Sequence, residues 1–187
     1  MNTVVLNLEP IAHLTDEQFF QLCMANRDLS LELNADRELV IVSPVGGESG
    51  NQEADLISDL TIWNRQNKLG KVFSSSTIFR LPSGANRSPD AAWVSLERWQ
   101  ALTPEQRKKF PPLTPDFLIE LRSETDTLKR LQEKMKEYLA QGLRLGWLVN
   151  PQNQQVEIYR QGKPVEVLAL PVILSGEDVL PGFELQL

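Results

Sequence analysis

The sequence predicts a mixed α/β fold, in which a mixed central sheet is flanked by helices and carries a hairpin near each end of the chain. Three observations support this prediction. Residues 116–150 have the pattern of an apolar strand, a helix and a second strand, which favours a parallel pair with a right-handed crossover. Two pairs of strand-like segments lie at 29–44 and 154–170. A hydrophobic fraction of 41% supports a buried core, and we expect one domain over residues 1–187.

Capping and breaking residues set the expected boundaries in the first part of the chain. Thr15 with Gln18, and Ser49 with Gln52, each form the capping-box pattern that begins a helix. Pro104 divides one helical stretch into two pieces. The expected elements are a helix at 15–25, strands at 29–34 and 37–44, a loop at 45–50, a helix at 51–67, strands at 71–82 and 91–95, and two short helices within 96–110.

The second part of the chain begins with a connector that prolines stiffen, at residues 111–115. Gly142 predicts the end of a helix, because glycine readily takes the left-handed conformation that follows a last helical turn. The expected elements are a strand at 116–123, a helix at 126–141, a strand at 145–150, and a closing hairpin of strands at 154–160 and 164–170.

Charge is distributed unevenly along the chain. The 187 residues carry 25 acidic and 19 basic side chains, which gives a net charge of −6. Residues 61–149 hold 15 of the basic and 9 of the acidic side chains, whereas both ends are acidic. Net acidity excludes a protein that coats nucleic acid through bulk positive charge, but it is compatible with a local basic groove.

The rarest residues exclude several kinds of site. Cys23 is the only cysteine, so no disulfide forms within the chain, and a reducing cytoplasm suits it. His13 is the only histidine, which excludes paired-histidine zinc sites and leaves a Ser-His-Asp triad dependent on one residue. The sequence has neither the features of a signal peptide nor an apolar run of the ~20 residues that a membrane helix needs. We therefore expect a cytoplasmic protein without a membrane segment.

A carboxylate and a cation stand within the most apolar strand of the sequence. Because side chains alternate along a strand, Glu120 and Arg122 are expected on one face, about 6–7 Å apart at ~3.3 Å per residue. Such charges are costly unless they are paired or used. In the following helix Lys134 lies at the edge of the apolar arc, where its ammonium can reach the strand. The other basic residues of this helix are expected to be solvated, namely Lys129, Arg130 and Lys136.

Asp90 supplies a second carboxylate, at the start of the strand 91–95 and directly after Pro89. Two carboxylates that converge near a lysine are typical of a site for a hard cation such as Mg²⁺. Such a cation can activate water and stabilise the charge that develops during phosphodiester hydrolysis. The residues therefore predict a metal site at Asp90 and Glu120.

The same residues resemble a known nuclease pattern. Pro89-Asp90, the triplet Glu120-Leu121-Arg122 and the basic helix after it resemble the PD-(D/E)XK restriction-endonuclease-like nucleases. Longer segments resemble the Uma-two family of restriction endonucleases, which is abundant in cyanobacteria: GGESGNQEADL, SSTIFRLPSGANRSPDAAWVSLERW, PDFLIELRSETD and EKMKEYLAQGLRLGWLVNP. The resemblance extends from about residue 15 to residue 187. It implies a restriction-endonuclease-like core and cleavage of phosphodiester bonds in DNA.

The resemblance also implies a role for each site residue. Asp90 and Glu120 would bind Mg²⁺ or Mn²⁺, and Lys134 or Arg122 would take the role of the lysine. Glu53, on the inward face of the helix 51–67, would be an additional acid. Arg122 departs from the family pattern at the third position of the triplet, and arginine stays protonated, so it cannot act as a general base. A lysine on the next helix, as Lys134 is, would fill that role.

Several alternatives stay open at this point. Arg122 can form a buried ion pair with Glu120, which would leave an inactive nuclease fold that binds nucleic acid or a protein partner. Asp90 can be only a turn residue, and Glu53 only a charge in the first turn of a helix. A hydrolase of small phosphorylated compounds would use the same acids. By analogy with restriction-type nucleases we also expect a homodimer, formed through an exposed apolar patch of Trp93, Trp99 and Phe110.

Overall fold

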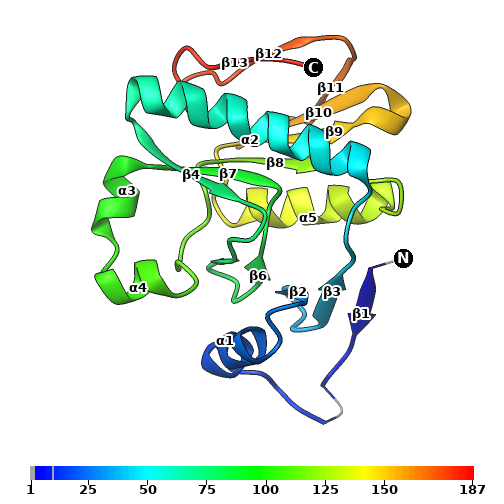
Figure 1. Cartoon of the computed structure of the whole chain (residues 1–187), viewed down its shortest axis with the longest axis vertical. Coiled ribbons are helices and arrows are strands. Elements are labelled where there is room, and N and C mark those ends of the chain that lie inside the picture. The colour runs from blue at the N-terminus through cyan, green and yellow to red at the C-terminus, as the bar shows by residue number, and fades with distance from the viewer. Residues whose placement is uncertain (1–2, 10) are drawn as a thin grey trace.

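A six-stranded mixed sheet forms the centre of the computed structural model, which describes residues 3–9 and 11–187 (Figure 1). The strand order is β11-β10-β9-β8-β7-β4. β8 and β9 are parallel, and the other neighbouring strands of this sheet are antiparallel. The predicted mixed central sheet is therefore confirmed. Its strands are β4 (Gly70–Ser74), β7 (Ala91–Ser95), β8 (Phe117–Leu121), β9 (Leu145–Asn150), β10 (Gln155–Arg160) and β11 (Glu166–Ala169).

The parallel pair is joined by the helix α5 (Leu128–Ala140), which confirms the predicted strand-helix-strand unit. The helix ends where glycine was expected to end it, since Gly142 has a φ of 99°. β10 and β11 form the predicted closing hairpin. These elements place the carboxyl end of β8 and the face of α5 beside each other.

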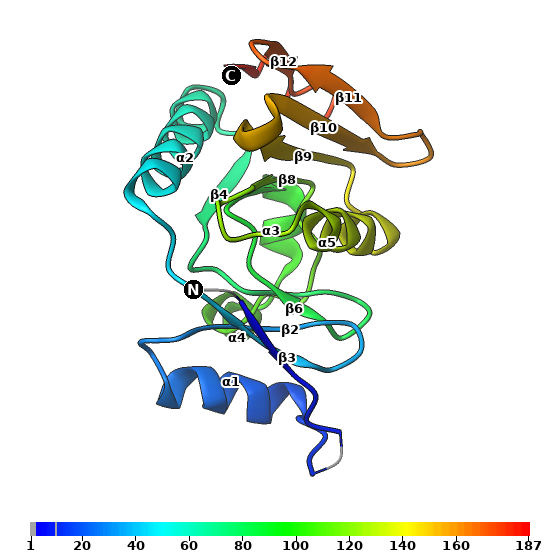
Figure 2. The same ribbon diagram turned by 90° about the vertical axis from the view of Figure 1, so that its right-hand side faces the viewer.

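Two helices cover opposite faces of the central sheet, as Figure 2 shows. The alternation of side chains along β8 separates the two layers: Phe117 and Ile119 pack in the core that α2 (Gly47–Asn67) covers, whereas Leu118 packs in the core that α5 covers. Glu120 has the parity of Leu118 and so points to the α5 side. No helix of the described residues is long and apolar enough to cross a membrane.

A second sheet, of strand order β1-β3-β2-β6-β5, lies next to the α5 side of the central sheet (Figures 1 and 2). β2 and β3 form the predicted hairpin, and β2 meets β6 through the single pair Leu33 and Asn86. The helix α1 begins with the predicted capping box at Thr15 and packs Phe19 against the hairpin. The elements are β1 (Val4–Leu6), α1 (Asp16–Ala25), β2 (Ser30–Leu33), β3 (Leu39–Val42), β5 (Phe79–Arg80) and β6 (Asn86–Arg87).

The last strands, β12 (Ile173–Ser175) and β13 (Glu184–Gln186), close the core on the α2 side. Phe183 lies parallel to the Trp147 ring at a centroid distance of 5.9 Å, and Trp63 of α2 contacts Phe183 at 5.6 Å. Each of these aromatic side chains buries enough apolar surface to contribute about 1.5–3 kcal/mol. The C-terminal segment thus fixes α2 on the sheet.

The start of α2 differs from the expectation. The helix begins at Gly47, with Gly46 as its N-cap, and the Gly50 N–H donates to the Gly46 carbonyl at 2.9 Å. Ser49 therefore lies inside the first turn, and the predicted capping box at Ser49 is wrong. Gly46 adopts the extended conformation that an N-cap needs without a side-chain cap, so the pattern of polar residues misplaced the helix start.

The single long strand predicted at 71–82 is also wrong. A turn follows Ser74, where the Thr77 N–H donates to the Ser74 carbonyl at 2.9 Å, and it separates β4 in the central sheet from β5 in the second sheet. Serine favours turns because its hydroxyl competes for backbone hydrogen bonds. The two short helices after β7 are confirmed as α3 (Leu96–Ala101) and α4 (Pro104–Lys108).

The exposed aromatic patch is not formed. Trp93 is 3% exposed and contacts Trp63, Trp99 packs on Phe73, and Phe110 packs against α1. The prediction rested on their nearness to the connector 111–115, but Trp93 is buried, and elements distant in sequence cover part of Trp99 and Phe110. The homodimer stays a prediction, without this patch to support it.

Gly70 allows the close approach of β4 and β7. A Cβ atom at this position would lie 2.3 Å from the Val94 carbonyl oxygen and 2.4 Å from the Trp93 ring. We therefore expect Gly70→Ala to destabilise the fold by about 1–3 kcal/mol, the usual cost of overpacking. The melting temperature would fall by about 2–4 °C for each kcal/mol in a chain of this size.

Gly50→Ala is the matched control, because its Cβ would make only an ordinary contact at 3.9 Å to Val45 within a helix. Alanine there is expected to raise stability by up to ~1 kcal/mol through helix propensity. Equal melting temperatures for the two variants would contradict the close approach at Gly70.

Candidate active site

The pairing of β7 with β8 brings two carboxylates together. Ala91 is opposite Ile119, so the next pair along the antiparallel register is Asp90 and Glu120, on the same face of the sheet. The Asp90 Oδ2 atom accepts the backbone N–H of Leu121 at 2.6 Å, which fixes its carboxylate across the end of β8. The structure therefore brings Asp90 and Glu120 together, on the face that α5 covers.

The environment of Asp90 disfavours its charged form. Burial raises the pKa of Asp90 well above its ordinary value, and the neighbouring charges of Glu120 and Glu53 raise it further. Lys134 and the Leu121 N–H act in the opposite direction without cancelling these effects. A bound cation would relieve this repulsion, because it would offer the carboxylates a shared opposite charge.

α5 delivers a cation and a hydroxyl to Glu120. The Lys134 Nζ lies 2.8 Å from Glu120 Oε1, and the Tyr138 hydroxyl donates to the same oxygen at 3.1 Å. Lys134 and Tyr138 are one helical turn apart and so reach the same side of the helix. Burial raises the pKa of Glu120 against the opposing charge of Lys134. Burial alone would lower the pKa of Lys134, but the charges of Glu120 and Glu32 outweigh it and raise this pKa.

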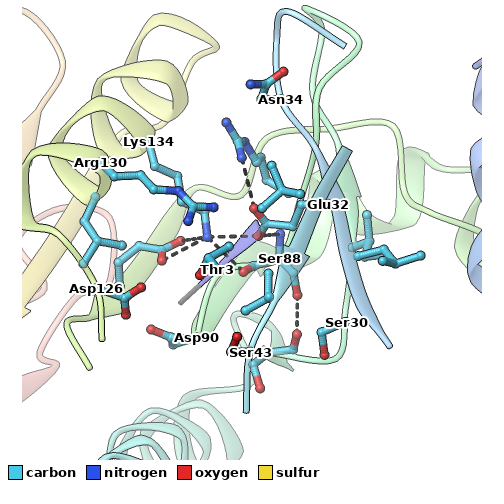
Figure 3. A pocket seen from close by; sticks show the side chains of 18 of the residues that line it. Thr3, Ser30, Glu32, Asn34, Ser43, Ser88, Asp90, Asp126, Arg130 and Lys134 are labelled. Atoms are coloured by element: carbon cyan, nitrogen blue, oxygen red, sulfur yellow. Dashed lines mark hydrogen bonds and ion pairs between the residues drawn. The ribbon is translucent and has the colours of Figure 1, made fainter. Parts of the chain in front are cut away.

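A network of charges that the sequence reasoning missed supports Lys134 from the other side (Figure 3). Glu32 on β2 lies 3.0 Å from the Lys134 Nζ and 3.0 Å from the Arg87 Nη1, and Arg87 in turn contacts Glu137 at 2.6 Å. Burial opposes ionisation of Glu32, but the charges of Lys134 and Arg87 prevail and lower its pKa to about 2. Glu32 is thus a carboxylate at neutral pH although it is only 2% exposed.

The signal for Glu32 was present in the sequence. Glu32 stands between Leu31 and Leu33 in an apolar strand, the same pattern that identified Glu120. The pairing of Glu32 with Lys134 could not be seen in the sequence, because the two residues are distant along the chain. Glu32 lies in β2 of the second sheet, and Lys134 lies in the helix α5. The structure shows which cation the Glu32 carboxylate meets, and the apolar pattern of β2 does not.

Glu53 of α2 also faces the site. The Ser75 hydroxyl donates to the Glu53 carboxylate, and the Ser75 carbonyl accepts the hydroxyl of Ser88. The turn that interrupts the predicted long strand therefore brings Ser75 to the edge of the site. Glu53 lines the same pocket as Asp90 and Glu120.

Arg122 does not stand beside Glu120, and the expected position of this side chain is wrong. Its guanidinium donates to the side chain of Asn150 at 3.2 Å and to that of Asn153 at 3.0 Å. Asn153 lies in the 3₁₀ turn η1 (Pro151–Asn153). The guanidinium also donates to the carbonyl of Asp126 at 3.2 Å. The reason is that β8 ends at Leu121, so strand alternation no longer directs the next side chain. The buried Glu120–Arg122 ion pair is likewise not formed among the described residues.

An open pocket of about 1140 Å³ adjoins the carboxylates. Arg130 lines it, one turn before Lys134 on α5, and Figure 3 shows its side chain beside that of Lys134. Within the described residues no carboxylate forms an ion pair with Arg130, so its charge is available to a ligand. The position of Arg130 at the pocket is compatible with the expected solvated charge.

The carboxylates of the site suit one kind of metal ion and not another. Among residues 3–9 and 11–187, no group of three His, Cys, Asp or Glu side chains is arranged to hold a metal ion. A site of two carboxylates does suit Mg²⁺, which usually takes one or two protein carboxylates and keeps waters or substrate phosphates. Asp90 and Glu120 fit that type of ion and not a closed structural zinc site.

The fold is that of a nuclease-type α/β protein. The chain belongs to the Uma2 family, whose model, described as "Putative restriction endonuclease", matches residues 16–187. The fold is similar to the crystal structure of a protein described as "a putative nuclease belonging to DUF820" from Anabaena variabilis ATCC 29413. That match has a TM-score of 0.71 and 17% sequence identity, and it covers 84% of this chain and 87% of the other. No curated protein matches the sequence.

The repulsion at Asp90 predicts a pH-dependent gain in stability for Asp90→Asn. Because the folded state holds the pKa of Asp90 above its ordinary value of 3.8, ionising Asp90 costs the metal-free fold stability as the pH rises through the folded pKa. Asparagine cannot ionise but keeps an oxygen that accepts the Leu121 N–H. We expect similar melting temperatures near pH 4, and an advantage for the variant at pH 8 of about 2–4 °C for each kcal/mol of relieved repulsion.

Thermal denaturation in a chelating buffer measures this difference. Asp59→Asn is the control, since Asp59 is an exposed carboxylate on α2. A metal-free Asp90→Asn protein that is less stable than the wild type at pH 8 would show that Asp90 is a structural residue.

Proposed function

We propose that this protein is a metal-dependent nuclease that hydrolyses phosphodiester bonds in DNA, with Asp90 and Glu120 as the ligands of Mg²⁺ or Mn²⁺. One observation carries the proposal: two carboxylates of adjacent strands converge beside a nearly buried lysine at the wall of an open pocket. Charges placed in this way destabilise a protein unless they are used, and perturbed carboxylates in a cleft are typical of catalytic sites.

Asp90 and Glu120 would hold the cation from two neighbouring strands. Bound there, it would activate a water molecule and neutralise negative charge on the phosphate. The hydrogen bond from the Leu121 N–H to Asp90 and the one from Tyr138 to Glu120 orient both carboxylates before any ligand arrives. Glu53 is proposed as the third acid, which would act through water from the α2 side.

Lys134 is proposed to act as a cation and not as a base. Two carboxylates contact its ammonium and raise its pKa, so it stays protonated at the pH of the cell. A protonated lysine in this place can stabilise, through its positive charge, a phosphate oxygen or the attacking water. Arg122 is left out of this chemistry, because its guanidinium is engaged by Asn150 and Asn153.

DNA is the proposed substrate because the pocket combines space with a cation, Arg130, that can meet a phosphate. Its volume of about 1140 Å³ exceeds what a mononucleotide-sized ligand needs, and it is open to solvent. Arg130 offers a guanidinium without an ion-pair partner among the described residues, which suits bidentate contact with a phosphate.

Asp90→Ala and Glu120→Ala are each expected to lower the rate of Mg²⁺-dependent plasmid cleavage by at least about 100-fold. Loss of groups that merely support metal ligands already costs about 10–100-fold, so loss of a ligand costs more. Cleavage of supercoiled plasmid on gels measures the rate, and titration calorimetry with Mg²⁺ measures the loss of binding. Asp59→Ala is the control, and unchanged cleavage by the two site variants would mean that the metal site is wrongly assigned.

Arg130→Ala is expected to weaken DNA binding to a similar extent for all sequences. Each lost phosphate contact lowers the slope of log K against log salt by about 1. Fluorescence anisotropy on the Asp90→Asn background separates binding from cleavage. Lys129→Ala is the matched control, because Lys129 is the neighbouring cation on α5, is 87% exposed and pairs with Glu133. Equal salt slopes for both variants would exclude Arg130 from the DNA contact.

A further inference from the structure

Glu32 is the most fully engaged carboxylate near the site. It belongs to β2 of the second sheet, is 2% exposed, and lies on the opposite side of Lys134 from Glu120. Its Oε1 atom contacts the Lys134 Nζ at 3.0 Å and accepts the Ser88 N–H at 2.9 Å, while its Oε2 atom contacts Arg87 at 3.0 Å. Both oxygens of Glu32 are therefore engaged by cations of the protein, Oε1 by Lys134 and Oε2 by Arg87.

Three acceptors surround the Lys134 ammonium. They are Glu120 at 2.8 Å, Glu32 at 3.0 Å and the Ser88 carbonyl at 3.3 Å. An ammonium has three N–H donors, so this set can use all of them and fix its direction. A lysine side chain is flexible and loses much rotamer freedom when it is held in one place. Without Glu32, the ammonium would lose one of its two carboxylate partners and could move away from its place beside Glu120.

We propose that Glu32 is a positioning residue, which acts on the reaction by holding the Lys134 ammonium beside Glu120 at the metal site. The inference rests on the proposed function, and it makes the N-terminal strands a part of the active site. Arg87 completes the arrangement, because it neutralises the second oxygen of Glu32.

Glu137 provides a matched control. It is a partly buried partner of the same Arg87, and its other oxygen accepts the Ala35 N–H at 3.0 Å. Among the described residues it forms no ion pair with Lys134. Glu137→Gln therefore removes a charge from the same network, on the same helix as Lys134, without freeing the ammonium.

The first experiment compares Glu32→Gln with Glu137→Gln in cleavage of DNA at saturating Mg²⁺, after thermal denaturation has measured the stability of each. We expect Glu32→Gln to lower kcat by about 10–100-fold, the range found for groups that orient a reacting residue. KM for DNA and the affinity for Mg²⁺ should stay close to the wild type, since Asp90, Glu120 and Arg130 are intact. Glu137→Gln should keep its kcat.

Equal losses of kcat in the two variants would overturn the inference, because they would reflect a general loss of stability. So would an unchanged kcat in Glu32→Gln. Where Glu32→Gln does not fold, Glu32→Asp carries the test, since it keeps the charge next to Arg87 but shortens the reach to Lys134. It should then lower kcat in the same direction while KM for DNA is retained.

A second readout does not depend on activity. An ammonium that is nearly buried and held by two carboxylates and a carbonyl exchanges its protons slowly. Lys134 should therefore give a side-chain ¹H–¹⁵N signal in the metal-free protein, assigned by its loss in Lys134→Ala. The signal should disappear in Glu32→Gln and persist in Glu137→Gln. Its persistence in Glu32→Gln would overturn the inference. A wild-type protein that cleaves no DNA would instead refute the proposed function, and the ammonium signal alone then decides whether Glu32 holds Lys134.

Discussion

The Lys134 ammonium, shared between Glu120 of the central sheet and Glu32 of the second sheet, is the contact on which the arrangement of the site depends. Moving charges out of water is costly, and the cost is offset only where each charge meets an opposite one and every donor and acceptor has a partner. The N-terminal hairpin is paired with β6 at one position only, so these buried ion pairs contribute to holding it against α5. If the proposed function holds, the same charges would serve both the fold and the chemistry, and they could not be varied independently.

Asp90 does not form an ion pair of this kind among the described residues. Its carboxylate receives one backbone hydrogen bond, but burial and two acidic neighbours oppose its charge. The central strands tolerate this cost because their other face is fully apolar, with Phe117 and Ile119 packed beneath α2. A rigid apolar layer on one side thus permits an unfavourable group on the other. Proteins commonly give up stability in this way where a site is set up for a ligand.

The sequence was informative where one local pattern determines the result. The strand-helix-strand unit, both hairpins and the capping box at Thr15 follow from apolar periodicity and turn chemistry within short segments, and they are confirmed. Two predictions failed, namely the unbroken strand through Ser74 and the position of Arg122. The alternation of side chains along a strand does not indicate at which residue the chain leaves the sheet. Glu32 carried the same signal as Glu120, but its partner could be known only from how two distant segments meet.

The hydrogen bond from Ala35 to Glu137 joins residues 102 positions apart in the sequence. Contacts inside β8, α5 and β9 close short loops, whereas this contact and its neighbours close a long one, whose entropic cost must be met before the contacts are gained. The order of events in folding follows from this difference. The central parallel unit can form early from local contacts, and the N-terminal hairpin completes the surroundings of Lys134 late. Catalytic competence would then report the last step of folding, not the formation of the core.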